Sequence, residues 1–242
     1  MTQPESATRA GGPTEEPAAE ASQFVQYLFF KTDPQWRRLP HEARSRGRRE
    51  FCEVIAAAGD GITTHAYSTL GLKASAELLL WQRCGGPEPL QELLCAALQS
   101  GLGQYLNVSY CLFGLTRPSV YTKRRTLQEQ AIDEPTRLKY LVVYPFVKSD
   151  SWYLMSRDAR QGMMNEHMRI GHDFADVRQL LLYATGLDDQ EFVVAYETDD
   201  LSRHQQLVMG LRATEGRRYT VRDTPIFTAV HKSLDAALAL LG

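Results

Sequence analysis

The chain has 242 residues, of which 43% are hydrophobic and 23% are charged, and its formal net charge is −2. This is enough apolar material for a substantial core, and a nearly neutral chain lacks the positive charge that binds most proteins to nucleic acids or anionic membranes. The longest apolar runs, such as 141–147, are far too short to cross a bilayer. We therefore expect a soluble globular protein with neither nucleic acid nor a membrane as its partner.

The N-terminal segment 1–21 is rich in Pro, Gly, Ala and Glu, and it contains no apolar core of a signal peptide. Such a segment buries too little surface to offset the entropy lost on ordering. We predict a disordered tail at 1–21 and a cytoplasmic location.

The pattern of apolar and turn-forming residues over 22–117 predicts a first module with the element order βαββαβ. A strand-like run at 23–32 precedes an arginine-rich helix from about Pro34 to Ala58, which ends before a glycine. Two strand-like runs, a helix and a final strand follow at 62–72, 76–84, 90–102 and 108–115. This order is typical of ferredoxin-like folds.

The same pattern recurs at 137–242, after a polar connector at 118–136. The strand-like runs and helices of this second series lie at 138–148, 156–171, 177–187, 191–198, 201–214 and 224–231. In each half a Gly-Leu turn, at Gly71 and at Gly186, precedes a strand and an amphipathic helix. We predict an α+β fold of two tandem ferredoxin-like modules whose sheets pack together as in a dimeric α+β barrel.

The sequence contains no phosphate-binding glycine loop, no zinc-protease motif and no nucleophile elbow. The candidate functional groups are therefore the polar side chains that lie within apolar elements. His167 is the most informative of these, since Met163, Met164 and Ile170 share its face of the predicted helix. Such a histidine is either a satisfied core residue or an axial ligand to a metal in an apolar pocket.

A second group of polar side chains lies on the predicted strand 138–148. Tyr140, Tyr144, Phe146 and Lys148 alternate onto one face, and roughly 13 Å of strand separates Tyr144 from Lys148. A phenol and an ammonium so spaced could contact different edges of one large planar ligand. The alternative is a core tyrosine and a lysine that marks the end of the strand in water.

Four motifs in the second half resemble the chlorite dismutase superfamily. They are Y-P-F-V-K at 144–148, S-W-Y-L-M at 151–155, R-x-x-R-Q-G-M-M-N-E-H at 157–167 and T-G-L-D-D at 185–189. The resemblance is strong over about 137–231 and only topological over the first half. Within the superfamily it is greatest to the coproheme decarboxylases.

The resemblance implies roles for individual residues. His167 matches the proximal iron ligand, Tyr144 the tyrosine that becomes a radical, and Lys148 the lysine beside a reactive propionate. The remaining ligand-binding positions that the resemblance implies are Pro145, Phe146, Val147, Gln179 and Arg217.

Gln179 matches a distal glutamine in a position where true chlorite dismutases have arginine, although a shift of one residue would place Arg178 there instead. A guanidinium stabilises an anionic oxychlorine species, whereas a neutral amide can only hydrogen-bond to peroxide.

Two positions depart from the family pattern. Arg217 stands where a propionate-binding serine is expected, and the expected upstream arginine aligns with Gln130. Three nearby arginines are candidates to replace that upstream residue, and the sequence leaves the choice open: Arg124, Arg125 and Arg137.

The function that the resemblance implies is conversion of Fe-coproporphyrin III to haem b with hydrogen peroxide, by a tyrosyl-radical decarboxylation of two propionates. It also implies a homo-oligomer, typically a pentamer, and coproporphyrin ferrochelatase as a candidate partner. The alternatives are a chlorite dismutase or peroxidase-like haem b enzyme, and a non-catalytic haem-binding protein.

Overall fold

The structure, a computed structural model, describes residues 22–122, 134 and 136–242. The predicted tail at 1–21 and most of the predicted connector lie outside the described residues. The same is true of Arg124, Arg125 and Gln130.

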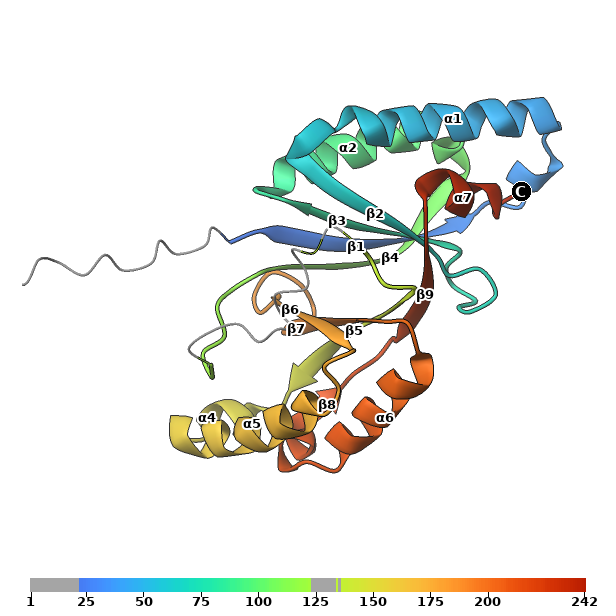
Figure 1. The fold of residues 1–242 in the computed structure, drawn as a ribbon. Coiled ribbons are helices and arrows are strands. Elements are labelled where there is room, and N and C mark those ends of the chain that lie inside the picture. Colours follow the sequence, from blue (N-terminus) through green and yellow to red (C-terminus); the bar gives the residue numbers. More distant parts are fainter. Residues whose placement is uncertain (1–21, 123–133, 135) are drawn as a thin grey trace, which may run out of the picture.

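The described strands form one antiparallel sheet that closes on itself (Figure 1). They are β1 (Phe24–Thr32), β2 (Ile62–Ser68), β3 (Leu78–Cys84), β4 (Leu106–Leu115), β5 (Tyr140–Lys148), β6 (Arg178–Tyr183), β7 (Phe192–Thr198), β8 (Thr220–Arg222) and β9 (Phe227–Lys232). Their order is β7-β6-β4-β1-β3-β2-β9-β5-β8, and an additional pairing of β7 with β5 closes the ring. β8 lies outside the ring and pairs only with the end of β5.

Each half of the ring has the strand order of a ferredoxin-like sheet. The first half runs β4-β1-β3-β2 and the second runs β9-β5-β7-β6, so the fourth, first, third and second strands follow one another in both. The predicted α+β class, with two ferredoxin-like sheets joined as in a dimeric α+β barrel, is confirmed. The module boundaries at 22–117, 118–136 and 137–242 stay predictions.

The two halves meet along two short seams. β4 and β6 pair through one register position, Leu115 with Tyr183. β2 and β9 pair through three, from Ala66 with Lys232 to Ser68 with Val230. Main-chain hydrogen bonds across the seams are therefore few, and side-chain packing inside the ring does most of the joining.

Helices cover the outside of the ring in two groups (Figure 1). The first sheet carries α1 (His41–Ala57), α2 (Pro87–Gln99) and α7 (Leu234–Ala239), and the second carries α4 (Asp150–Leu154), α5 (Arg157–His172) and α6 (Leu201–Arg212). α1 begins at His41 and not at Pro34, because the chain first makes a short 3-10 turn at Trp36–Arg38 and then passes through the extended Pro40. The strand predicted at 62–72 ends at Ser68, before a turn that contains Gly71 at φ 77°.

Three clusters of apolar side chains form the core. One fills the inside of the ring, between the two sheets, and one lies beneath α1, α2 and α7. The third lies beneath α5 and α6, and its fully buried members are only Val177, Val194, Tyr196 and Leu207. The small size of this third cluster is the structural reason for a cavity at that place.

Among the described residues, no helix combines the length and the hydropathy needed to span a membrane.

Candidate functional site

A cavity of about 420 Å³ lies between the second sheet and the helices that cover it. Its sheet wall is formed by outward-facing side chains of β5, β6 and β7, and its helix wall by side chains of α5 and α6. Both walls are mainly apolar, with a few polar groups among them, and the volume is typical of a pocket for a small molecule.

His167 projects into this cavity from the middle of α5. Burial and the nearby Lys148 ammonium lower its pKa from 6.5 to about 4, although the charge of Glu166 acts in the opposite direction. The imidazole is therefore neutral at ordinary pH, and no described residue forms a hydrogen bond with it. A neutral imidazole without a partner inside an apolar pocket suits a transition-metal ligand.

Tyr144 lies on the opposite wall, on the outward face of β5. Burial raises the pKa of its phenol, and the ring of Tyr196 on β7 is its neighbour, with ring centroids 6.2 Å apart. The phenol is therefore protonated at neutral pH and faces the same space as His167.

Lys148 is on the same face of β5, at the end of the strand, where its ammonium lines the cavity. The ammonium donates to the carbonyl oxygen of Gly216 at 2.8 Å and to Oγ1 of Thr220 at 3.1 Å. Burial, followed by the neighbouring positive charge of Arg217, lowers its pKa from 10.5 to about 8. The predicted phenol and ammonium thus share one wall, as the strand period requires.

The neighbours of these residues on β5 divide by the same alternation. Phe146 lines the cavity and stacks on Phe192 of β7 with ring centroids 4.8 Å apart. Pro145 and Val147 alternate to the other face of the strand and do not line the cavity. The structure therefore does not bring these two predicted side chains into the site.

On β6 the structure distinguishes between the two candidate positions for a distal residue. Gln179 lines the cavity, directly opposite Tyr196 in the β6–β7 register. Arg178 does not line it, and its guanidinium donates to the carbonyl oxygen of Thr136 at 2.7 Å. Of the two candidate positions, β6 thus presents to the cavity the one with a neutral amide.

Arg217 lines the cavity from the 3-10 turn at Glu215–Tyr219. Its guanidinium lies 3.2 Å from the Asp223 carboxylate, which also pairs with Arg212 at 3.3 Å. Two cations that share one carboxylate leave this side of the cavity with a net positive charge, which favours an acidic ligand.

Arg137 does not line the cavity. Its side chain is 1% exposed and lies 3.1 Å from the Glu197 carboxylate, and its guanidinium sits 5.0 Å from the centre of the Trp81 ring. Trp81 belongs to the cluster inside the ring. Arg137 is therefore committed to the interior of the ring, which removes it from the three upstream candidates.

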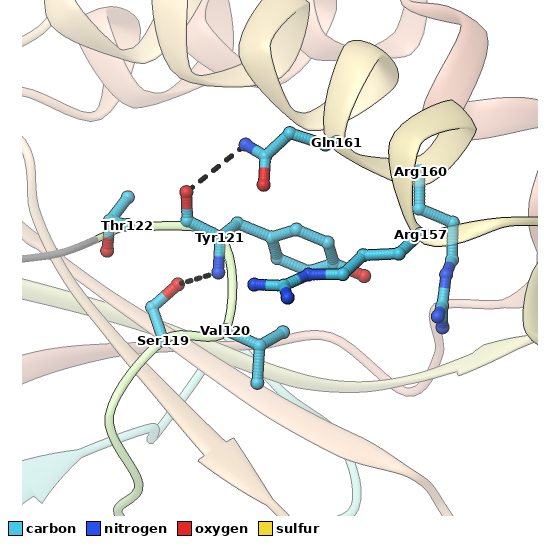
Figure 2. Close-up of a pocket in the computed structure, with 7 residues that line it drawn as sticks. All are labelled: Ser119, Val120, Tyr121, Thr122, Arg157, Arg160 and Gln161. Carbon is cyan, nitrogen blue, oxygen red and sulfur yellow. Dashed lines mark hydrogen bonds between the residues drawn. The ribbon is translucent and has the colours of Figure 1, made fainter.

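A second hollow of about 750 Å³ adjoins the cavity and shares Ser119–Thr122 and Arg160 with it. Figure 2 shows how its walls are made: Arg157, Arg160 and Gln161 come from α5 and face the segment Ser119–Thr122 that follows β4. The Gln161 amide donates to the carbonyl oxygen of Tyr121 at 3.1 Å. The two basic side chains make this mouth of the cavity suitable for the acidic edge of a ligand.

Sequence reasoning missed several groups that the structure adds to the site, above all Tyr196 of β7, Arg212 of α6 and Trp152 of α4. Tyr196 could have been found, since Phe192, Val194 and Tyr196 alternate along one strand. Trp152 lies in a five-residue helix, which is too short to give a helical period.

The sequence and the fold are similar to those of known proteins. The family model described as Chlorite dismutase matches residues 44–232. A coproheme decarboxylase of Mycolicibacterium smegmatis is 33% identical over 176 residues, which cover 72% of this chain and 75% of the relative. A chlorite dismutase of Ideonella dechloratans is 23% identical over 209 residues, which cover 82% of this chain and 72% of the relative.

Among solved structures, the chlorite dismutase of Candidatus Nitrospira defluvii in complex with imidazole superimposes with a TM-score of 0.82. It is 24% identical, and the match covers 90% of this chain and 94% of that one. The likeness to this structure supports the fold, while the family model covers most of the sequence. On these grounds, the chain belongs to the chlorite dismutase family.

Proposed function

We propose that this protein is a coproheme decarboxylase, which converts Fe-coproporphyrin III to haem b. The observation that carries the proposal is the presence of His167 on one wall of the cavity and of Tyr144 and Lys148 on the facing wall. A flat tetrapyrrole between these walls would have the imidazole on one side of its plane and the phenol and ammonium on the other. The similarity to a relative named coproheme decarboxylase supports the same substrate.

The residues present suit such a substrate. The neutral His167 imidazole would be the iron ligand, and the apolar walls would contact the macrocycle. The carboxylates of the substrate require cations, and the cavity has Lys148 together with the Arg212 and Arg217 pair on Asp223. Phe146 would contact the ring face, while Pro145 and Val147 would support the strand from behind.

The overall reaction is balanced by hydrogen peroxide as the oxidant. A propionate side chain, one peroxide and one proton give a vinyl group, carbon dioxide and two waters, and a second round completes haem b. The iron of the substrate supplies the oxidising equivalents once it has reacted with peroxide. Gln179, as a neutral amide, would hydrogen-bond to peroxide above the iron.

Tyr144 would act as the hydrogen carrier. Its hydroxyl gives up one electron and one proton, and its oxygen then takes a hydrogen atom from the propionate, which restores the phenol. The substrate loses a second electron as carbon dioxide leaves. Lys148 would hold the carboxylate within reach of Tyr144 by a charge-assisted hydrogen bond.

The direct test is mass spectrometry of Fe-coproporphyrin III that has been incubated with the protein and hydrogen peroxide. The expected product has lost two carboxyl units and carries two vinyl groups. Unchanged Fe-coproporphyrin III, bound with a Soret band, would contradict the proposal and indicate a non-catalytic haem-binding protein.

A chlorite-decomposing or peroxidase-like haem b enzyme is the second candidate, since a chlorite dismutase is also among the relatives. The neutral Gln179 disfavours it, because a guanidinium at that position would stabilise an anionic oxychlorine species, whereas an amide carries no charge. Oxygen release from chlorite by the haem b-loaded protein, measured with an oxygen electrode, would favour this second candidate.

We also propose a cytoplasmic homo-oligomer, with the pentamer as the expected state and coproporphyrin ferrochelatase as a candidate donor of the substrate. Sedimentation of the purified protein tests the first point, and co-sedimentation with the ferrochelatase tests the second.

A further inference from the structure

The turn between β6 and β7 lies against the end of β5. The β5–β7 ladder ends with the pair Phe146 and Phe192, and beyond it β5 pairs with β8 through a register irregularity between Val147 and Lys148. At this irregularity the main-chain N–H of Lys148 donates to the carboxylate of Glu191 at 2.7 Å, in a partly buried hydrogen bond. A side chain thus supplies the acceptor just beyond the last residue pair of the ladder, where the chain after β6 still forms the turn.

The main chain of Glu191 is held by the turn that contains the T-G-L-D-D motif. Its carbonyl oxygen accepts from the main-chain N–H of Ala184 at 2.9 Å, and from the N–H and Oγ1 of Thr185, both at 3.1 Å. Gly186 has φ 76°, the left-handed conformation that glycine adopts in such a turn without steric cost. The carboxylate of Glu191 therefore extends from a fixed base.

The same turn is also bound to the strands on either side. The carboxylate of Asp188 accepts from the main-chain N–H of Phe113 on β4 at 3.2 Å. The guanidinium of Arg222 on β8 donates to the carbonyl oxygen of Asp189 at 3.1 Å. The turn is therefore joined to β4 and β8 by these two bonds, and to the end of β5 by Glu191.

We propose that Glu191 is a positioning residue for Lys148, and that its carboxylate fixes the main chain at the end of β5 so that the ammonium faces the cavity. The far end of the Lys148 side chain is held by the carbonyl oxygen of Gly216 and by Oγ1 of Thr220. Glu191 fixes the near end, so both ends of this long side chain are held before a ligand binds. The proposal rests on the proposed function in so far as the group that Lys148 meets is a carboxylate of a porphyrin.

The first test needs neither substrate nor turnover. The protein is labelled with 15N-lysine, and the amide resonance of Lys148 is assigned by its loss in Lys148→Met. In Glu191→Ala we expect this amide to exchange with deuterium about tenfold or more faster, because it has lost a hydrogen bond to a charged acceptor. Glu191→Gln keeps an oxygen acceptor and should bring the rate back to within about threefold of the wild type. An unchanged rate in Glu191→Ala would overturn the proposal.

Glu50→Ala is the matched control. The carboxylate of Glu50, on α1 and away from the cavity, accepts from the main-chain N–H of Gly101 at 2.9 Å in a partly buried bond. Its loss removes a comparable hydrogen bond, and the exchange rate of the Lys148 amide should not change. If Glu191→Ala does not fold, Glu191→Gln decides the matter. A neutral acceptor makes the weaker bond, so the Lys148 amide proton should move upfield, and an unchanged resonance would overturn the proposal.

The second test asks whether Glu191 acts through Lys148. Spectroscopic titration with Fe-coproporphyrin III is carried out on Glu191→Ala, on Lys148→Met and on the double variant. Glu191→Ala should weaken binding by about threefold to tenfold when Lys148 is present, and by less than about twofold in Lys148→Met. Equal losses in the two backgrounds would mean that Glu191 acts on the fold in general, and would overturn the proposal. If the wild-type protein binds this porphyrin but does not decarboxylate it, the proposed function fails, while both tests of Glu191 keep their meaning.

Discussion

The Lys148 ammonium lies 4.5 Å from the centre of the Trp152 ring, at the place where β5 ends and α4 begins. Trp152 is buried, and an ammonium over an aromatic face is attracted to it. Two of the three ammonium hydrogens are used by Gly216 and Thr220. The third is available to an anion in the cavity, and the position of the group is fixed before the anion arrives.

Lys148→Met should weaken binding of Fe-coproporphyrin III by about tenfold to a hundredfold. The change removes one charge-assisted hydrogen bond, worth about 1.5–3 kcal/mol, and keeps most of the apolar stem. Spectroscopic titration with the porphyrin measures the effect. Lys139→Met is the control, because Lys139 is exposed and does not line the cavity, and equal losses in both variants would contradict a specific role for Lys148.

The affinity for a propionate-bearing porphyrin should fall as pH rises through about 8. Burial lowers the pKa of Lys148 in the free protein to about 8, so the ammonium is charged below this pH and neutral above it. Titrations from pH 6.5 to 9.5 would show constant affinity at the lower end and a progressive loss above about 8. In Lys148→Arg, which stays charged throughout, the loss should disappear. A wild-type profile that is flat to pH 9.5 would contradict the assignment.

Tyr144→Phe should bind Fe-coproporphyrin III about as tightly as the wild type and yield no haem b. The phenol supplies a transferable hydrogen and little of the binding energy, since the cations that hold carboxylates are elsewhere in the cavity. Chromatography of the porphyrin products after peroxide addition measures turnover. Tyr140→Phe, on the same strand but away from the cavity, should retain activity. Normal haem b production by Tyr144→Phe would refute the role given to Tyr144.

His167→Ala should lower the affinity for Fe-coproporphyrin III by more than about tenfold and change its absorption spectrum. Loss of the imidazole removes one of the two histidine side chains by which α5 lines the cavity, the other being His172 at the end of the helix. His41→Ala, at the exposed start of α1, is the control. An unchanged spectrum in His167→Ala would mean that the iron is held by another group.

Glu77→Gln should lower the stability of the first half of the ring in a pH-dependent way. Burial alone would raise the pKa of Glu77, but hydrogen bonds from Lys31, Thr32 and Arg37 outweigh it and lower the pKa from 4.5 to about 2. The ionised carboxylate therefore stabilises the fold above about pH 4.5, and this contribution is lost as pH falls toward about 2. The shift corresponds to at most about 3 kcal/mol.

Urea unfolding at several pH values tests this expectation. The difference between wild type and Glu77→Gln should be greatest near neutral pH and should shrink as pH falls below about 4.5. Glu92→Gln, on the exposed face of α2, should unfold like the wild type at each pH. A difference that is the same at pH 7 and pH 3 would contradict the ion-pair explanation.

The parts of this structure that could be predicted are those governed by local periodicity. Alternation along 138–148 correctly placed Tyr144, Phe146 and Lys148 on one face, and the helical period put His167 beside Met164, which shares its cavity. The order of strands and helices in each half followed from the same patterns. The likeness of the two halves, seen first at Gly71 and Gly186, reappears in their equal strand order.

What could not be predicted depends on contacts between distant segments. The proximity of the Tyr144 and Tyr196 rings depends on the β5–β7 register, which the sequence does not contain. Arg137 was a candidate for the cavity, but its neighbour Glu197 holds it inside the ring. Short elements such as α4, β8 and α7 were not predicted, because they span too few residues to show a periodic pattern. Pro145 and Val147 were included as part of a motif, although the strand turns them away.

The interior layer that the two sheets share makes partial unfolding of one half of the protein unfavourable, and this affects its abundance in a cell. Phe29 of β1 and Phe227 of β9 stack there with ring centroids 3.8 Å apart, although they come from opposite halves. Since the two seams contain few main-chain bonds, opening either one would uncover this layer, and neither half could melt alone without exposing it. Substitutions at Phe29 or Phe227 would therefore act on cellular abundance, through chaperones and proteases, and not on the chemistry of the cavity.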